Sequence, residues 1–180
     1  LEQHLVDIRG ASPEEASLIA RVSRGRVGWA LQALEDESLM QERVSRVEGA
    51  IQLLSMTFAA RFDFSRELDT LYRRDRAAAM DTLEQWTTWW RDLLLVKTGC
   101  AESVINIDYV NDVTEQAQRL SLEQIRDYIG KLNEARRDLD LNVISRLVFD
   151  SLVYTMPRIT KPSGGVIGLP VVLRDKSETQ

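Results

Sequence analysis

The side chains that could act as nucleophiles or bind a metal are few in this 180-residue sequence. It contains one cysteine, Cys100, and one histidine, His4. These two residues cannot supply the Cys and His ligands of a structural zinc site, and a Ser–His–Asp or Cys–His arrangement would depend on His4 alone. A single cysteine also excludes an internal disulfide and favours a reducing compartment. We therefore expect no catalytic, metal-binding or cofactor-binding residue, and we predict that the chain is not an enzyme.

Paired carboxylates and clustered arginines have ordinary explanations here. Carboxylates about one helical turn apart, such as Glu123 and Asp127, are interleaved with arginines, which indicates solvated helix faces and salt bridges. Di-iron bundles also need Glu-x-x-His motifs, and the sequence contains no Walker loop. Arg136 and Arg137 would close one helix, where positive charge suits the helix dipole. The same two side chains are candidates for contacts with a partner.

Three of the four tryptophans lie in residues 83–99, within a long helix that we predict from about Ala77 to Thr98. Trp86, Trp89 and Trp90 have the i, i+3, i+4 spacing of side chains that share a helix face. This pattern fits either a central core helix or an aromatic platform for a ligand, and large aromatics at this spacing more often fill cores. No histidine, metal ligand or basic frame accompanies them, so we expect Trp86 and Trp90 in the core. Trp89 is a candidate for a subunit contact.

The composition is that of an ordinary globular protein with an acidic balance. Apolar residues make up 44% and charged residues 28%, and the formal net charge is −5. This balance argues against a protein whose main task is gripping nucleic acid. No apolar run approaches the roughly 20 residues of a membrane-spanning helix, and no signal peptide is visible. We predict a cytoplasmic location without a membrane partner, and because Leu1 stands in what reads as a helix, we expect a fragment of a longer protein.

Helical periodicity dominates the chain before Pro157, and no segment there shows the alternation of a half-buried strand. The run Ser12-Pro13-Glu14-Glu15 combines an N-cap, a first-turn proline and a capping-box glutamate, which indicates a helix start. Pro157 indicates the end of the last helix. We predict an all-α fold with a stub of two or three helices over residues 1–35, a bundle of five or six helices over 36–157, and a flexible tail over 158–180.

Some helix limits follow from the same periodicity. The segment from Phe58 to about Arg73 reads as helical, with a break within residues 61–65 as an open alternative. The helix that starts at Ser121 reads to about Arg137, and a short link over residues 138–140 follows it. In the last helix we expect one apolar stripe made of Leu141, Ile144, Leu147, Val148, Ser151, Leu152 and Thr155.

Two segments, taken in order, resemble subunits of the bacterial DNA polymerase III clamp loader. Residues 18–31, LIARVSRGRVGWAL, resemble the end of the lid domain in its ATPase-like subunits, where a G-x-x-G-x-A-L pattern recurs. Residues 142–157, NVISRLVFDSLVYTMP, resemble the closing helix of the delta prime C-terminal domain, with Asn142, Arg146 and Pro157 at matching positions. The W-x-x-W-W-R-D-L-L-L segment is similar to the long central helix of that domain.

The resemblance implies a noncatalytic member of this family. Related active ATPases carry a nucleotide-sensing arginine at the position of Gly28, so the glycine points to the delta prime type. Residues 1–35 would then be the end of an AAA+ lid domain, and residues 36–157 a collar domain for oligomerisation. The implied partners are gamma/tau-type and delta-type subunits of the complex that loads the sliding clamp, which would contact DNA only through that complex.

The residue patterns and the resemblance together give four residues that we expect at subunit contacts: Trp89, Arg136, Arg137 and Arg146. Two alternatives stay open at this point. One is the collar domain of a gamma/tau-type subunit, against which Gly28 argues. The other is an unrelated helical adaptor with an aromatic ligand pocket lined by the tryptophans.

Overall fold

The computed structural model describes residues 1–159, apart from the side chains of Ile8 and Arg9, and it is helical throughout this part. Residues 160–180, which hold most of the predicted tail, lie outside the described residues. The all-α prediction is confirmed. The α-helices and two short 3-10 turns are α1 (Glu2–Arg9), α2 (Pro13–Val22), α3 (Val27–Glu35), α4 (Glu37–Leu53), α5 (Phe58–Arg74), α6 (Arg76–Lys97), η1 (Ala101–Ser103), η2 (Ile107–Tyr109), α7 (Val110–Arg119), α8 (Leu122–Asp140) and α9 (Ser145–Thr155).

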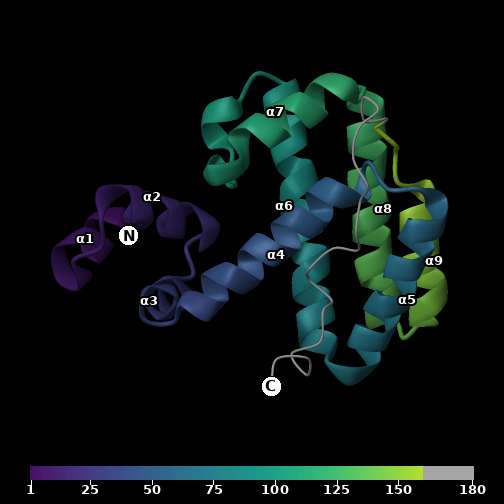
Figure 1. Cartoon of the computed structure of the whole chain (residues 1–180), viewed down its shortest axis with the longest axis horizontal. Helices are drawn as coiled ribbons and strands as arrows, with labels where there is room; N and C mark the ends of the chain where they lie inside the picture. Colours follow the sequence, from purple (N-terminus) through teal and green to yellow (C-terminus); the bar gives the residue numbers. More distant parts are fainter. Residues whose placement is uncertain (160–180) are drawn as a thin grey trace.

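Helices α1 to α3 form a small stub at one end of the molecule (Figure 1). The Ser12 hydroxyl accepts a hydrogen bond from the Glu15 amide at 3.1 Å, and Pro13 occupies the first turn of α2, as the sequence predicted. Gly10 ends α1 with a φ of 71°, a left-handed conformation that glycine adopts at little cost. The stub has its own small core, made of Leu5, Ala11, Ala16, Ile19, Ala30 and Ala33.

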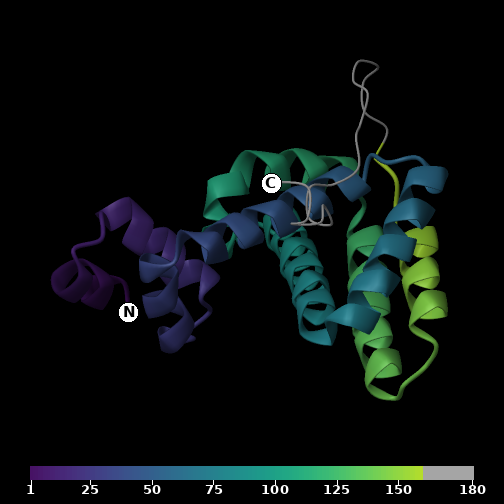
Figure 2. The same ribbon diagram turned by 60° about the horizontal axis from the view of Figure 1, so that its bottom comes forward.

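Helices α4 to α9 form the bundle, and α6 lies at its centre. Helix α6 packs against α4, α5, α7 and α8, while α9 packs on α5 and α8. Figure 2 shows α5, α8 and α9 side by side, with the stub joined to them through α4. Trp86 stacks on Phe64 at a centroid distance of 5.6 Å, and Trp90 lies 4.3 Å from the ring of Tyr128. Each of the two tryptophans is about 1% exposed, so their predicted place in the core is confirmed.

Helix α5 is continuous through the segment where a break was an alternative, and this segment contains a buried arginine. Arg61 is 0% exposed, and its guanidinium donates hydrogen bonds to main-chain carbonyl oxygens at the ends of two other helices. The acceptors are the oxygens of Leu53 (2.9 Å), Leu54 (3.1 Å), Val153 (3.4 Å), Met156 (2.6 Å) and Pro157 (2.9 Å). Arg61 therefore satisfies carbonyls that helix ends leave without an intrahelical partner.

Two helix limits near the C-terminus differ from the prediction. Helix α8 continues to Asp140 rather than ending at Arg137, because Leu139 is buried in the bundle core. The chain then turns at Asn142, whose φ is 58°, and α9 begins at Ser145. The short link predicted at residues 138–140 is therefore wrong, and the turn lies a few residues later.

The apolar stripe predicted for the last helix is also wrong for most of its members. Only Val148 and Leu152 of that stripe are buried, and the core face of α9 is completed by Phe149 and Val153. Apolar residues occur on two sides of this helix, so periodicity alone fits more than one face. Packing against α5 and α8 decides which side is buried.

Candidate subunit-interaction site

The side of α9 that points away from the bundle carries large exposed apolar side chains. Leu141 is 77% exposed, Ile144 64%, Leu147 60% and Tyr154 66%. Ile144, Leu147 and Tyr154 follow one another at i, i+3 and i+10, so they share one side of the helix. Leu141 precedes them in the turn after α8. We call this surface, together with Phe58, the α9 face.

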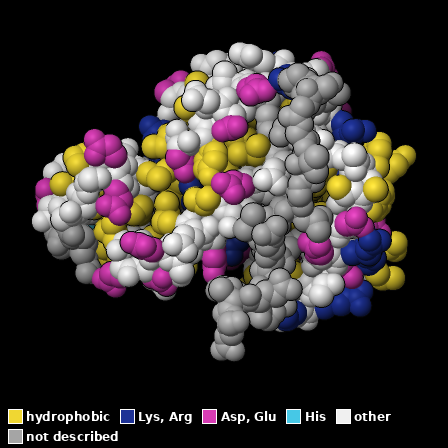
Figure 3. All heavy atoms as spheres, viewed as in Figure 1, with side chains coloured by type: hydrophobic (Ala, Val, Ile, Leu, Met, Phe, Trp, Pro, Cys, Tyr) yellow, Lys and Arg dark blue, Asp and Glu magenta, His cyan; other side chains and the backbone are white. Residues whose placement is uncertain are grey.

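The α9 face extends onto the start of α5. The ring of Phe58 is 46% exposed and lies 6.2 Å from the ring of Tyr154, and the Arg158 guanidinium is 5.6 Å from the Phe58 ring centre. In Figure 3, apolar side chains gather at the right-hand edge of the molecule, where α5 and α9 lie. Contiguous exposed apolar surface bordered by charge is typical of protein–protein contact sites.

The four residues predicted at subunit contacts do not form one surface. Arg146 lies on α9, where its Nε donates to Asp150 Oδ2 at 2.8 Å, beside the α9 face. Arg137 is exposed in the last turns of α8. Arg136, on the same helix, forms an ion pair with Glu84 of α6. Arg146 and Arg136 therefore contact different carboxylates, and Arg137 is exposed at a third position.

Trp89 is buried, so the prediction that it faces a partner is wrong for the folded chain. Its side chain is 0% exposed, and its Nε1–H donates to Gln116 Oε1 of α7 at 2.9 Å. Gln116 in turn donates to the Ile51 main-chain oxygen of α4 at 3.1 Å. Helix α7 covers the side of α6 that the spacing of the tryptophans left open. Trp89 thus helps to hold three helices together.

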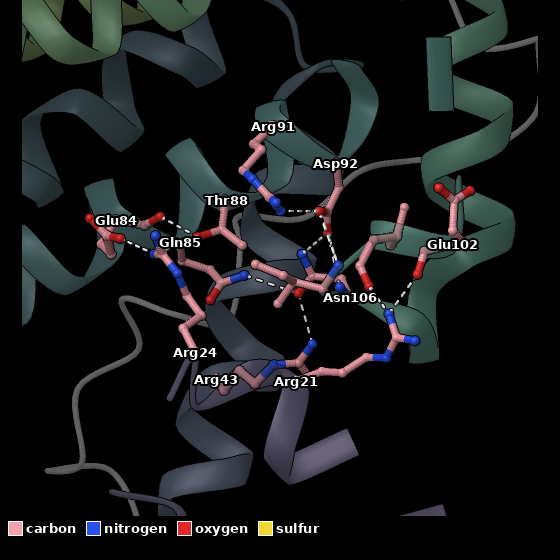
Figure 4. A network of polar contacts seen from close by, with 12 residues as sticks. Arg21, Arg24, Arg43, Glu84, Gln85, Thr88, Arg91, Asp92, Glu102 and Asn106 are labelled. Carbon is pink, nitrogen blue, oxygen red and sulfur yellow. Dashed lines mark hydrogen bonds and ion pairs between the residues drawn. The ribbon is translucent and has the colours of Figure 1, made fainter. Parts of the chain in front are cut away.

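A set of polar contacts joins the stub to the bundle, and we call it the polar joint (Figure 4). Arg21, at the end of α2, donates to the main-chain oxygens of Glu102 (2.8 Å) and Val104 (3.0 Å). Arg24, in the following turn, pairs with one carboxylate oxygen of Glu84, and Arg136 pairs with the other. The buried cores of the stub and of the bundle are separate among the described residues, although Leu39 and Met40 of α4 pack against the stub core. The polar contacts and this apolar packing on α4 together orient the stub.

The charge state of Glu84 follows from two opposing effects. Partial burial raises the pKa of this carboxyl, but hydrogen bonds and charge attraction from Arg24 and Arg136 lower it by more. The net pKa of Glu84 lies below its ordinary value. Glu84 is therefore ionised near neutral pH, and it balances charge from two arginines that come from the stub and from α8.

A polar cluster with a buried centre, at Asp92 and Asn106, lies next to the joint. Asp92 of α6 is 0% exposed and accepts hydrogen bonds from the amide (2.9 Å) and the side-chain nitrogen (2.7 Å) of Asn106, and from the Ile105 amide. Asn106 Oδ1 accepts from Arg43 of α4 at 2.7 Å, and Arg43 also pairs with Asp108 at 2.6 Å. These carboxylates are compensated by fixed donors, so the cluster holds the loop between α6 and α7 in place rather than offering a reactive group.

Most of these polar residues were not predicted from the sequence, although one signal was present. Asp92 stands beside a run of leucines, and Arg61 has helical spacing to the core residues Phe64 and Leu68. A charged residue on an apolar helix face is a sign of a buried, hydrogen-bonded group. No comparable signal marks Arg24 or Glu84, because nothing in the sequence shows that they meet.

Gly28, His4 and Cys100 were weighed for chemistry in the sequence. Within residues 1–159 they belong neither to the polar joint nor to the polar cluster beside it. Gly28 is exposed in the first turn of α3, and a Cβ there would have no heavy atom within 4 Å, so this position does not require a glycine for space. His4 is exposed and Cys100 half-buried. Among the described residues, no group of three His, Cys, Asp or Glu side chains is placed to hold a metal ion. Within the same part of the chain, no helix is both long and apolar enough to cross a membrane.

The fold and its surfaces define a class: an all-α domain with an exposed apolar helix face and buried polar contacts. A family model described as DNA polymerase III, delta subunit, C terminal matches residues 42–154. Since the match covers more than half of the chain, the chain belongs to this family, whose members are clamp-loader components of DNA polymerase III. The match confirms the clamp-loader part of the resemblance. Neither a curated protein nor a solved structure gave a match.

Proposed function

We propose that the chain is the noncatalytic oligomerisation region of a delta prime-type clamp-loader subunit. In this proposal residues 36–157 are the collar domain and residues 1–35 the end of an AAA+ lid domain. The chain acts in the cytoplasm, and its partners are gamma/tau-type and delta-type subunits. It contacts DNA only through the assembled complex that loads the sliding clamp. Its contribution to loading is to hold subunits in place.

The α9 face is the observation that carries this proposal. It presents large apolar side chains at helical spacing on the outer side of the matched region. Each large apolar side chain that a partner buries contributes roughly 1.5–3 kcal/mol. Arg146, which lies beside this face and pairs with Asp150, supplies a polar border, as is usual at the rim of an interface.

Gly28 supports the delta prime assignment over the gamma/tau alternative. A glycine has no guanidinium with which to contact a nucleotide phosphate, and the open space around a Cβ at this position shows that packing does not require the glycine. A Walker loop in a longer sequence of the protein would reverse this assignment. The adaptor alternative loses its basis, because the chain belongs to the clamp-loader family and Trp86, Trp89 and Trp90 are each at most about 1% exposed.

Complex formation with the matching subunits tests the proposal. We expect the chain, mixed with gamma/tau-type and delta-type subunits at micromolar concentration, to form a complex whose mass light scattering reports. The double variant Ile144→Ser and Leu147→Ser removes apolar area from the α9 face, and we expect it to weaken assembly at least about tenfold.

A matched control uses exposed apolar residues from elsewhere on the bundle. Val110 and Leu122 are 40% and 44% exposed, so the variant Val110→Ser and Leu122→Ser removes similar side chains from another surface. We expect it to assemble as the unmodified chain does. Absence of any complex with the unmodified chain would contradict the proposed function, and equal assembly by both double variants would contradict the α9 face as its site.

A further inference from the structure

A groove lies between α2 and α4, with the end of α3 as its third side, and its volume is about 530 Å³. Its apolar lining consists of Leu18 and Ile19 from α2, Leu34 from α3, and Met40 and Val44 from α4, together with Ala33. Figure 3 shows apolar side chains in this region, between the stub at the left and the rest of the molecule. Volumes of about 300–1,000 Å³ are usual for binding pockets. We call this hollow the α2–α4 groove.

Helix α4 presents a complete ridge to this groove. Glu37, Met40, Gln41, Val44 and Ser45 follow the i, i+3, i+4, i+7, i+8 spacing of one helix side, and all five line the groove. None of these residues is fully buried. Further along α4, Val47, Ala50 and Leu53 belong to the bundle core. Along two turns of α4 this ridge is partly open to solvent: Glu37 and Gln41 are exposed, while Met40, which packs against the stub core, and Val44 are half-buried.

The charged side chains that line the groove are acidic. Glu15, at the start of α2, and Glu37, at the start of α4, are both exposed and line the groove. No lysine or arginine stands among its lining residues in the described chain. Figure 3 shows acidic side chains around the stub on this side. A ligand that fits the groove is therefore apolar where it meets Leu18 and Val44, and cationic at its margins.

The backbone around the groove decides whether a partner peptide can bind there as an extended strand or as an α-helix. The groove is lined by three α-helices, whose backbone hydrogen bonds are satisfied within each helix, so these walls offer no sheet edge to an extended peptide. An incoming α-helix brings its own backbone hydrogen bonds and can pack its side-chain ridge against that of α4. Helix-in-groove binding is thus the mode that this surface permits.

We propose that the α2–α4 groove binds an amphipathic α-helix of a partner protein that has lysine or arginine on both sides of its apolar stripe. Apolar side chains of that helix lie between Leu18 and Val44, which are both half-buried, and its cations pair with Glu15 and Glu37. This interaction goes beyond the proposed assembly role and does not rest on it. The α9 face and the groove share no residue, so the two surfaces can be occupied together.

A synthetic helix tests the proposal directly. The probe is a fluorescein-labelled peptide of about 14 residues with leucines at i, i+4, i+7 and i+11 and lysines beside them. We expect fluorescence anisotropy with the 180-residue chain to give a dissociation constant of roughly 1–100 μM. The double variant Glu15→Lys and Glu37→Lys should weaken binding at least about tenfold, because it replaces attraction with repulsion at the rim.

Two controls separate groove binding from general attraction of a basic peptide to an acidic protein. The variant Glu115→Lys and Glu134→Lys makes the same charge change at exposed sites on α7 and α8, and we expect it to change affinity less than about twofold. A peptide with alanines in place of the leucines keeps every charge, and we expect it to bind at least about tenfold more weakly.

A further variant keeps the test decisive if the double reversal disturbs folding. Gln41 is exposed on the α4 ridge, so Gln41→Lys places a cation in the groove without burying it or removing an apolar contact. We expect it to weaken binding of the leucine–lysine peptide with an unchanged circular dichroism spectrum. Equal affinity of the groove and control variants, or equal binding of the alanine peptide, would overturn the proposal.

Discussion

Arg61 shows how one side chain can hold two helix ends in place. Its guanidinium is fully buried and surrounded by main-chain carbonyl oxygens from the ends of α4 and α9. Burial lowers the pKa of Arg61 to about 10, so the group remains protonated near neutral pH. A buried charge is tolerated when enough hydrogen-bond partners surround it, and the carbonyls provide them.

Removing Arg61 is therefore expected to destabilise the fold strongly. We expect Arg61→Ala to lower the free energy of unfolding by about 3–5 kcal/mol, because the helix-end carbonyls lose their donors and a cavity forms. Arg66→Ala on the same helix is the matched control, since Arg66 is 63% exposed, and we expect a change within about 0.5 kcal/mol. Urea denaturation followed by circular dichroism measures both, and similar losses in the two variants would contradict this role.

At the scale of the element, α9 has two apolar sides with different functions. The inner side packs Phe149 against Tyr72 of α5, with ring centres 5.8 Å apart. The outer side leaves Ile144 and Leu147 exposed. A helix that is apolar on both sides is expected where one side joins the core and the other meets a partner. The same helix thus links the stability of the bundle to its proposed assembly.

Replacing one large side chain on each side of α9 with alanine should show, through the free energy of unfolding, which side is in the core. We expect Phe149→Ala to lower the free energy of unfolding by about 3–5 kcal/mol, because it opens a cavity in the core. Leu147→Ala should change it by no more than about 0.5 kcal/mol, since that side chain is already in water. Thermal and urea unfolding report both values. A loss above about 2 kcal/mol for Leu147→Ala would mean that the predicted stripe, and not the observed one, faces the core.

At the scale of the whole molecule, the stub and the bundle have separate cores, and polar contacts link them. Arg24 and Glu84 are 42% and 31% exposed, so water and salt screen their attraction, and such pairs contribute no more than about 1 kcal/mol. The orientation of the stub therefore depends on these modest interactions together with the packing of Leu39 and Met40 of α4 against the stub core.

The variant Glu84→Gln is expected to loosen the joint without unfolding the bundle. It removes the negative charge that both Arg24 and Arg136 contact. We expect faster amide hydrogen exchange in the turn at residues 23–26 and in the loop at 102–106, with little change in α8. Arg126→Ala, which breaks an exposed pair with Asp127, is the control and should leave exchange at the joint unchanged.

The stabilising contribution of Glu84 to the polar joint is expected to be lost at acidic pH. The pKa of Glu84 is lower in the folded chain than in the unfolded one, so the unfolded state binds more protons as the pH falls. The contribution of Glu84 is therefore fully present above its unfolded pKa of about 4.3 and is lost as the pH falls through the lower folded value. The exchange difference between Glu84→Gln and the unmodified chain should be present at pH 7 and disappear in acid. A difference that grew in acid would contradict it.

The sequence predicted those parts of the site and fold that depend on near neighbours. Ser12 caps α2 because its partner, the Glu15 amide, lies in the same turn. Trp86 and Trp90 lie in the core because their spacing alone puts them on one apolar helix side. Arg61 could not be assigned in this way, since the oxygen of Met156 that it contacts is 95 residues away in the chain.

The sequence by itself determined the helical fold, most helix starts and the clamp-loader family, because caps and apolar periodicity act within a few turns. Tertiary structure alone decided that Trp89 is buried beneath α7, that α9 exposes Ile144 and Leu147, and that Arg24 meets Glu84. The physical reason is the same in each case. A helix with apolar residues on more than one side can bury any of them, and only the helices that pack around it select which side reaches water.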